Sequence, residues 1–287
     1  PLSIVAVEAA YREGGEWLDQ VLEYLKGNIE FIQSYLEKNL PDAKLINHQA
    51  TYETMTLFIH GFSASTSEFQ NLSKKFSERN IPHYIPTLSG FGVLDFNLIE
   101  KINFSDWLRD AQNSMNLVKS ISSKVNIIGH SMGALVALYL SQYHEVENLI
   151  LTSPYLTPKK NHKFYTKLLL QPLVGEVLST LNPTIPKSSN REKEIFPNRF
   201  IYHSVPINAI KSLWQLQEVI NYEKVKAIKI SILVGEKDNT VKIEDLKKFL
   251  TSKKMNYEMF EYKNSGHNLL EEKEAEIVEK KIISIIE

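Results

Sequence analysis

Cysteine is missing from the 287-residue sequence, so thiol catalysis, disulfide bonds and cysteine-ligated zinc sites are excluded. The chain also lacks an excess of charge of either sign, because its formal net charge is only −1. Such a balance gives no general electrostatic attraction to nucleic acid or to an anionic membrane surface. No stretch approaches the roughly 18 uninterrupted apolar residues of a membrane-spanning helix. We therefore expect no nucleic acid partner and no stable membrane insertion.

The amino-terminal end has no apolar core of the kind found in secretory signal peptides, and its first twenty residues carry Glu8, Glu13, Glu16 and Asp19. The hydrophobic share of 43% and the charged share of 23% are ordinary for a soluble globular protein. A chain of this length can bury a large core, either as one α/β domain or as one domain with an appendage. The composition therefore predicts a soluble, cytoplasmic protein.

The stretch around Ser131 is the most informative in the chain. A short apolar run at residues 125–128 is typical of a buried strand, and the alanines and leucines after residue 133 favour a helix. Between them lies Gly-His-Ser-Met-Gly at residues 129–133, a G-x-S-x-G sequence in the strand-turn-helix context of a nucleophile elbow. The alternative is a glycine-bounded turn in which the serine is incidental. The elbow interpretation therefore requires a general base and an acid elsewhere in the sequence.

A serine hydroxyl is a weak nucleophile and needs a general base, which an acidic side chain must orient. In chains with this elbow, the acid and then the histidine follow the serine. Asp238 comes shortly after a strand expected at 230–234, and His267 follows a strand expected at 257–262. The ends of parallel strands meet at one edge of a sheet, so we predict Ser131, Asp238 and His267 as a catalytic triad.

Other acids and histidines compete for these roles. Glu236 is tight to the end of its strand, and Asp245 lies on a helix expected at 243–252. His60 and His130 flank the site within their motifs and are expected to pack and hydrogen-bond rather than catalyse. No metal site is predicted, because the remaining histidines have no ligand-like spacing: His48, His83, His144, His162 and His203. No cofactor is expected, since acyl transfer by a serine, a histidine and an acid needs none.

An oxyanion formed at a substrate carbonyl needs two preorganised N–H donors. The backbone N–H of Met132, directly after the nucleophile, is one candidate. The other should come from the turn after the strand expected at 55–59, which reads His60-Gly61-Phe62, so we assign it to Phe62. The Phe62 side chain is also expected to wall a pocket for the acyl group.

From residue 53 onward, strand and helix patterns alternate, which predicts an α/β fold with a mostly parallel, doubly wound sheet. Ser65 and Glu68 have the spacing of a capping box before a helix that runs to about residue 80. Further helices are expected at 104–122, 243–252 and 275–286. Further strands are expected at 82–86, 125–128, 146–152, 230–234 and 257–262.

Residues 157–227 interrupt this alternation with helix-leaning sequence that contains several prolines. An insertion at this point should lie over the carboxyl ends of the strands, where open α/β sheets bind ligands. We predict a helical cap whose apolar residues at 168–178 contact an acyl chain. The excess of basic residues over 157–200 fits either an anionic or interfacial substrate or an ordinary solvated face.

Residues 53–287 resemble the α/β-hydrolase fold, specifically the small carboxylesterases and monoacylglycerol lipases with a compact cap. The motifs that carry the resemblance are His60-Gly-Phe62, Gly129-His-Ser-Met-Gly133, Gly235-Glu-Lys-Asp238-Asn-Thr-Val241 and Ser265-Gly-His267. The resemblance implies Ser131 as the nucleophile, Asp238 as the acid and His267 as the base, with Phe62 and Met132 as oxyanion donors. It departs at Gly90-Phe91-Gly92, where these enzymes often have Gly-His-Gly, which bears on pocket shape and not on competence.

The expected activity is hydrolysis of short- to medium-chain carboxylic esters or monoacylglycerols through an acyl-enzyme on Ser131. The same triad serves equally for a thioester, a lactone or an amide, so these substrates stay open. A protein that only binds a ligand on a hydrolase scaffold belongs to a different class. Covalent labelling by a fluorophosphonate separates that class from an enzyme.

Residues 1–52 look like a separate helical extension with a larger share of acidic residues. They resemble part of the PLP-dependent C–S lyases and related class I aminotransferases, in which this segment is the long helix leading into the small domain. The Schiff-base lysine of that family has no counterpart here, so no PLP binding is expected. Apolar residues at helical spacing from Leu18 to Leu36 predict a helix that docks, either on the rest of its own chain or on a second copy in a homodimer.

Overall fold

The computed structural model describes residues 52–92, 101–157, 184–186, 202 and 204–287, together with positions 19, 20, 23, 24, 26–28 and 30. The chain divides into two compact units, residues 1–50 and residues 51–287. In the first unit the described positions are helical, and Tyr24 is 70% exposed. The docking or dimerisation expected of residues 1–52 falls mostly outside the described residues and stays a prediction.

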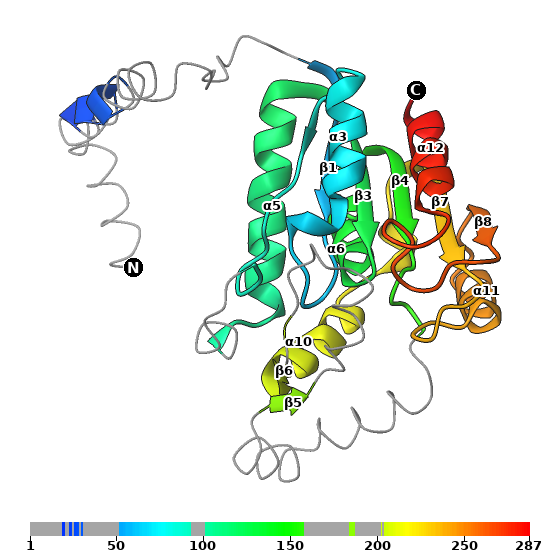
Figure 1. Cartoon of the computed structure of the whole chain (residues 1–287). Coiled ribbons are helices and arrows are strands. Elements are labelled where there is room, and N and C mark those ends of the chain that lie inside the picture. Colours follow the sequence, from blue (N-terminus) through cyan, green and yellow to red (C-terminus); the bar gives the residue numbers. More distant parts are fainter. Residues whose placement is uncertain are drawn as a thin grey trace. The chain divides into compact units, whose positions relative to one another are not determined.

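The described part of the second unit is built on a six-stranded parallel sheet with the strand order β2-β1-β3-β4-β7-β8 (Figure 1). Parallel neighbours need long crossover connections, which here contain the helices. The mostly parallel sheet predicted from the alternating patterns is therefore confirmed. In sheet order the strands are β2 (His83–Tyr84), β1 (Tyr52–Ile59), β3 (Ser122–His130), β4 (Val146–Thr152), β7 (Ala227–Gly235) and β8 (Glu258–Tyr262).

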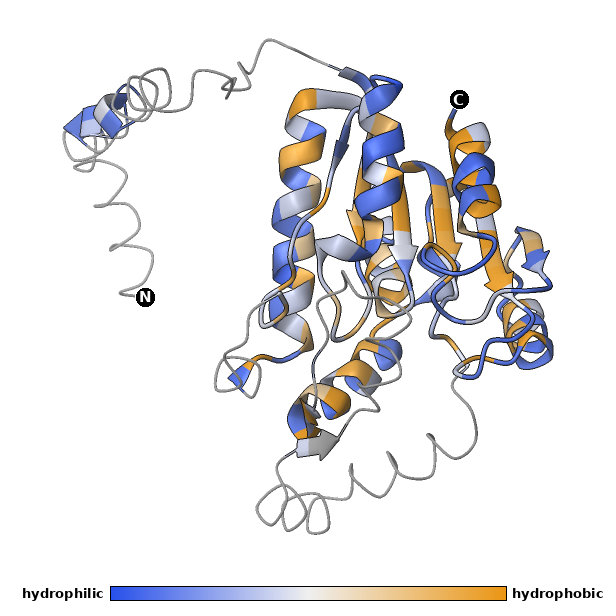
Figure 2. Ribbon diagram, viewed as in Figure 1, coloured by the Kyte–Doolittle hydropathy of each residue, from blue (hydrophilic) through white to orange (hydrophobic). Residues whose placement is uncertain are grey.

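Helices pack on both faces of this sheet, as a doubly wound fold requires. One apolar core is shared by the sheet and the helices α5 (Phe104–Ile121), α6 (Met132–Ser141), α10 (Ile207–Glu218) and α11 (Ile243–Ser252). A second core on the opposite face is shared with η1 (Thr66–Phe69), α3 (Gln70–Glu78) and α12 (Ala275–Ile286). Figure 2 shows hydrophobic residues concentrated along β4 and β7, between these two layers of helices.

Strand β1 shows why the strands of the sheet could be predicted from the hydrophobic pattern of the sequence. Leu57 and Ile59 point into the first core and Phe58 points into the second, and all three are fully buried. Successive side chains of a strand point to opposite faces, so a strand covered on both faces is a continuous apolar run. Burying each such side chain stabilises the fold by roughly 1.5–3 kcal/mol.

Some element boundaries agree with expectation and others do not: the strand expected at 82–86 is only His83–Tyr84, and the helix expected to run to about residue 80 is η1 followed by α3, which ends at Glu78. Helices α11 and α12 have the predicted bounds. Strand β3, expected from residue 125, begins at Ser122, directly after α5. Its first residues pair with the start of β1, with Tyr52 opposite Ser122 and Thr54 opposite Lys124. These residues extend the strand through backbone pairing, which a hydrophobic pattern does not register.

The capping box expected at Ser65 and Glu68 does not form. The Ser65 side chain caps the 3-10 turn η1 by accepting from the N–H of Ser67, at 3.3 Å. The Glu68 carboxylate accepts instead from the N–H of Gly61, at 2.8 Å. The true capping box lies at the start of α5, where Asn103 and Asp106 exchange side-chain to backbone hydrogen bonds.

The predicted cap at 157–227 is described only in part. A short antiparallel pair, β5 (Thr184–Pro186) and β6 (Ser204–Pro206), precedes α10. Helix α10 contributes Ala209, Leu213 and Leu216 to the first core. The apolar segment at 168–178 lies outside the described residues, so its contact with an acyl chain stays a prediction. Every helix in the described ranges is too short or too polar to cross a lipid bilayer.

Candidate active site

Ser131 occupies a strained turn between β3 and α6. Its backbone angles are φ 53° and ψ −111°, in the region that L-residues other than glycine seldom adopt. A conformation of this kind persists only where the surroundings hold it, and it occurs most often at functional sites. Here the N–H of Ser131 donates to the carbonyl of Thr152 at 2.9 Å, and the Ser131 carbonyl accepts from Tyr155 at 3.2 Å. The turn is therefore anchored to the end of β4.

The two glycines of the elbow permit the close approach of α6 to the sheet. A Cβ on Gly133 would lie 2.0 Å from the carbonyl oxygen of Ile59, and one on Gly129 would lie 2.5 Å from the carbonyl oxygen of Gly133. Neither distance is possible for a side chain. The G-x-S-x-G sequence thus reflects packing of backbone on backbone, in addition to the chemistry of the serine.

The three predicted triad residues lie at hydrogen-bonding distance in a row. The Nε2 atom of His267 is 2.8 Å from the Ser131 Oγ, and its Nδ1 is 2.8 Å from the Oδ2 of Asp238. The His267 side chain is 21% exposed, whereas the Asp238 side chain is 2% exposed. The site is thus accessible at the imidazole and closed at the carboxylate.

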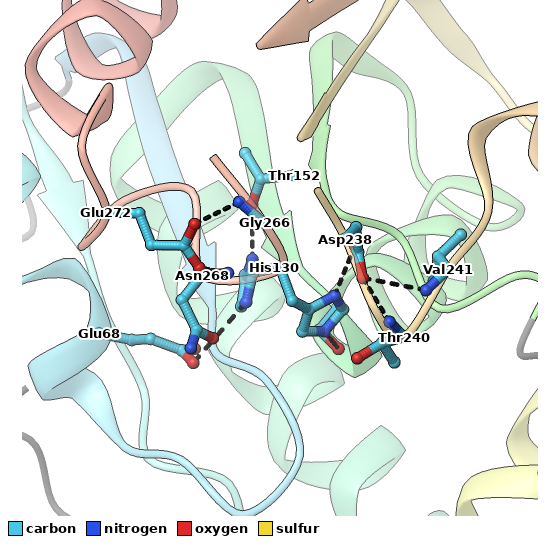
Figure 3. A network of polar contacts seen from close by, with 11 residues as sticks. Glu68, His130, Thr152, Asp238, Thr240, Val241, Gly266, Asn268 and Glu272 are labelled. Atoms are coloured by element: carbon cyan, nitrogen blue, oxygen red, sulfur yellow. Dashed lines mark hydrogen bonds and ion pairs between the residues drawn. The ribbon is translucent and has the colours of Figure 1, made fainter. Parts of the chain in front are cut away.

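Asp238 is held by the loop that follows β7 (Figure 3). Its Oδ1 accepts from the N–H of Thr240 at 2.6 Å and from that of Val241 at 3.0 Å. Burial alone would raise the pKa of Asp238. The hydrogen bond and charge of His267, together with the two N–H groups, outweigh this effect and lower the pKa. Asp238 is therefore ionised at neutral pH.

The ionised carboxylate decides the tautomer of His267. A carboxylate only accepts hydrogen bonds, so the proton of a neutral imidazole must be on Nδ1. The Nε2 atom then carries the lone pair and accepts from the Ser131 hydroxyl. This is the arrangement that a general base requires for removing the proton of a serine nucleophile.

A carboxylate that the sequence did not single out supports the His267 loop. Glu272 accepts from the N–H of Gly266 and, at 3.0 Å, from the N–H of Asn268, the two residues that flank His267 (Figure 3). In the sequence Glu272 belongs to the charged run Glu271-Glu-Lys-Glu274, which is typical of a solvated helix start. Only its distance from His267, five residues, hints at a role.

The two predicted oxyanion donors follow β1 and β3, whose ends are neighbours because these strands pair. The Phe62 ring lies in an aromatic cluster, with ring centres 5.6 Å from Phe91 and 6.0 Å from Trp107. Phe91 is buried and stacks on Trp107 at 5.4 Å. The phenylalanine of Gly90-Phe91-Gly92 thus packs in an apolar cluster beside the His60-Gly61-Phe62 turn, the predicted oxyanion loop. Tyr202 donates to the Gly90 carbonyl at 3.2 Å and extends this cluster.

His60 is not placed for catalysis. Its Nε2 accepts from the N–H of Leu88 at 3.0 Å, so its proton is on Nδ1, which lies 2.9 Å from the Gly61 carbonyl oxygen. Burial lowers the pKa of His60, and the Gly61 carbonyl and the Glu68 charge offset this only in part. His60 is therefore a neutral, structural residue.

The described residues contain no group of three or more histidines or acids that could hold a metal ion. An open cavity of about 350 Å³ borders the His267 loop. Its lining is polar and includes Asn239, Asn264 and Asn268. Water can therefore reach the outer side of the loop that carries the imidazole.

Comparison with known proteins gives partial matches among curated proteins. The chain is 25% identical over 88 residues to the thermostable monoacylglycerol lipase of Bacillus sp. (strain H-257), which is 31% of this chain and 35% of that protein. It is also 32% identical over 68 residues to the cystathionine beta-lyase PatB of Bacillus subtilis (strain 168), which is 24% of this chain and 17% of that protein. The chain thus spans about a third of the length of the monoacylglycerol lipase and about a sixth of the length of the cystathionine beta-lyase.

The fold and the family extend over most of the chain. A chain from the structures of LipS and LipT, two metagenome-derived lipolytic enzymes, superposes with a TM-score of 0.69 at 16% identity and covers 83% of this chain and 94% of that one. At this identity the likeness shows the fold, which is that of an α/β-hydrolase. A family model described as serine aminopeptidase, S33, matches residues 51–274. The strand order, the turn at Ser131 and this match together place the chain in the serine aminopeptidase, S33, family of α/β-hydrolases.

Proposed function

We propose that the chain is a serine hydrolase that cleaves carboxylic esters through an acyl-enzyme on Ser131. The observation that carries the proposal is the row of two 2.8 Å hydrogen bonds from Ser131 through His267 to Asp238. A serine, a correctly protonated imidazole and an ionised acid in this order are the groups that acyl transfer needs.

In the proposed first step, His267 takes the Ser131 proton while Oγ attacks the ester carbonyl carbon. The carbonyl oxygen becomes an oxyanion, which the N–H groups of Phe62 and Met132 stabilise. The C–O bond to the alcohol then breaks, and the alcohol leaves with the proton from His267. In the second step His267 takes a proton from water, whose oxygen attacks the acyl carbon. The bond between that carbon and Ser131 Oγ then breaks, and His267 returns the proton to Oγ, releasing the acid and free Ser131.

An ester with an apolar acyl group is the substrate class that the surroundings support. Phe62, partly exposed beside the predicted oxyanion donors and backed by the buried rings of Phe91 and Trp107, offers an apolar surface that suits an alkyl chain. The names of a curated relative, a monoacylglycerol lipase, and of a structural neighbour, a lipolytic enzyme, point in the same direction. We propose short- to medium-chain esters or monoacylglycerols, and a series of p-nitrophenyl esters and monoacylglycerols of increasing acyl length measures the preference.

Replacement of the nucleophile tests the reaction type. Ser131→Ala should lower kcat for p-nitrophenyl esters by on the order of a million-fold, because no other group takes over the attack. It should also abolish covalent labelling by a fluorophosphonate. Ser120→Ala, on the exposed side of α5, is the matched control and should retain both. Turnover by Ser131→Ala, or a wild-type chain that neither turns over esters nor labels, would refute the proposal.

The description of the matching family as serine aminopeptidase favours amides as the second candidate substrate class. The same triad cleaves an amide when His267 protonates the leaving amine. Amino-acid p-nitroanilides, assayed beside p-nitrophenyl esters, thioesters and lactones, separate the candidates. A kcat/KM for p-nitroanilides equal to or above that for esters would replace the esterase assignment with a peptidase one.

A further inference from the structure

Glu68 is a buried carboxylate directly beneath the predicted oxyanion loop. It lies on η1, seven residues after Gly61, and it is 4% exposed. A carboxylate removed from water in this way is costly unless other groups satisfy it. Its Oε2 accepts from the N–H of Gly61 at 2.8 Å. One oxygen of the Glu68 carboxylate is therefore hydrogen-bonded to the loop that carries Phe62.

The second oxygen of Glu68 faces the nucleophile elbow. Glu68 Oε1 is 3.8 Å from the Nε2 of His130, the residue immediately before Ser131 (Figure 3). The other ring nitrogen of His130 is 3.0 Å from the Thr152 hydroxyl, and the side chains of both Glu68 and His130 are 3% exposed. Glu68 is thus hydrogen-bonded to Gly61 after β1, and His130 at the end of β3 lies at hydrogen-bonding distance from Thr152 at the end of β4. The two side chains approach each other at 3.8 Å, a contact longer than a hydrogen bond.

Gly61 lies close to both His130 and Glu68. A Cβ on Gly61 would lie 3.2 Å from the Cδ2 of His130 and 3.3 Å from the Oε2 of Glu68. The His130 ring is in turn next to that of His267, with ring centres 5.4 Å apart. The loop, the elbow and the general base are therefore in mutual contact through Glu68 and His130.

The orientation of the Gly61-Phe62 segment decides where the Phe62 N–H points. An oxyanion hole stabilises the tetrahedral intermediate only if its donors are already about 2.7–3.1 Å from the position the oxyanion will take. We propose that Glu68 is a positioning residue for the oxyanion hole: its carboxylate holds the Gly61 amide and, through His130, keeps the Phe62 loop in register with Ser131. This inference rests on the proposed function.

Two substitutions of similar size separate positioning from burial. Glu68→Gln keeps an oxygen that can accept from Gly61, whereas Glu68→Met fills the same space without an acceptor. We expect Glu68→Met to lower kcat for a p-nitrophenyl ester about 100-fold with KM within about two-fold, the loss typical of one oxyanion donor. Glu68→Gln should retain kcat within about ten-fold. Glu78→Gln, on the exposed end of α3, is the matched control and should behave as the wild type.

A boronic acid that adds to Ser131 gives a second measurement, because its tetrahedral adduct occupies the oxyanion hole. Its inhibition constant should rise by a factor similar to the loss of kcat in Glu68→Met and stay near the wild-type value in Glu68→Gln. Circular dichroism and thermal unfolding confirm that each variant is folded. If Glu68→Met does not fold, Glu68→Asp tests the same point, since its shorter carboxylate cannot reach Gly61 and kcat should fall at least ten-fold.

Several outcomes would overturn the inference. These are an unchanged kcat in Glu68→Met (or in Glu68→Asp when that variant stands in), equal losses in Glu68→Met and Glu68→Gln, and a loss confined to KM. A wild-type chain without esterase or amidase activity would instead refute the proposed function. The two failures are therefore distinguishable in the same set of assays.

Discussion

At the scale of single residues, Asp238 holds His267 in one tautomer. Asp238→Asn should keep the position of the side chain but lower kcat on the order of 10⁴-fold, because an amide can stabilise the wrong tautomer of the imidazole. Steady-state kinetics with a p-nitrophenyl ester measure the effect. Asp245→Asn, an exposed position on α11, is the control. A comparable loss in Asp245→Asn would contradict the assignment of the acid.

His60 should make stability depend on pH. Burial holds its pKa below the ordinary value of 6.5, so the unfolded chain binds this proton more readily than the folded one. The free energy of unfolding should therefore fall as the pH decreases below about 6.5. Urea denaturation at pH 7.5 and 5.5 measures this loss. The loss of stability between pH 7.5 and 5.5 should be smaller in His60→Gln than in the wild type. His144→Gln, at a less buried histidine, should reduce this loss less than His60→Gln does.

The carboxylates around the site show which contacts could not be predicted from sequence patterns. Ser131, Asp238 and His267 could be chosen from the sequence because each follows an expected strand, and the structure brings them together. Glu68 matched a local capping pattern, yet its carboxylate reaches the N–H of Gly61. Glu272 lay in a charged run and clamps the His267 loop. Such partners depend on how loops fold back, which neither periodicity nor motif spacing encodes.

At the scale of elements, the backbone of the loop after β8 packs closely on Gly235 at the end of β7. A Cβ on Gly235 would lie 2.2 Å from the Ser265 carbonyl oxygen and 2.4 Å from that of Gly266. Gly235→Ala should therefore displace the segment that carries His267, lowering kcat at least ten-fold and stability by about 2–4 kcal/mol. Gly27→Ala, where a Cβ has open space, is the control. Wild-type kcat and melting temperature in Gly235→Ala would contradict this packing.

Helices α3 and α12 are joined by an ion pair across the second face of the sheet. Lys75 Nζ is 2.5 Å from Glu279 Oε2, and the two side chains are 30% and 3% exposed. Lys75→Ala should cost about 1–3 kcal/mol because it leaves a buried carboxylate without its cation, the value being reduced by the partial exposure of Lys75. Chemical denaturation measures it. Lys74→Ala, at an exposed neighbour, should change the free energy of unfolding by less than about 0.5 kcal/mol. Equal losses of stability in Lys74→Ala and Lys75→Ala would contradict a stabilising role for the buried ion pair.

The elements themselves were largely predictable because buried strands and amphipathic helices leave clear patterns. Helices α11 and α12 had the expected bounds. The polar start of β3 was not predictable, because Ser122 joins the sheet through pairing with Tyr52, seventy positions earlier in the chain. The strand order is likewise set by three-dimensional crossovers, and the sequence alone provided only the alternation of strands and helices.

At the scale of the whole molecule, the proposed catalytic groups all lie in the unit of residues 51–287. A chain reduced to 51–287 should therefore keep the kcat of the full chain within about two-fold. Residues 1–52 have apolar positions at helical spacing, so we expect them to dock either on the rest of their own chain or on a second copy in a homodimer. A dimeric full chain beside a monomeric shortened chain would support the second alternative. Size-exclusion chromatography with light scattering measures both masses. Two monomers would exclude dimerisation through the amino-terminal helix.

The hydrogen bond between Ser131 and His267 joins residues 136 positions apart, and His267 follows the last strand at the edge of the sheet. The six strands of the main sheet are all parallel to their neighbours, so each pairing in that sheet closes a long loop, and such contacts form slowly. Recovery of catalytic activity should therefore report the completion of folding. In a refolding experiment, ester turnover should return no sooner than the slowest recovery of secondary structure or fluorescence, since the base reaches the nucleophile only once the final strand is in place.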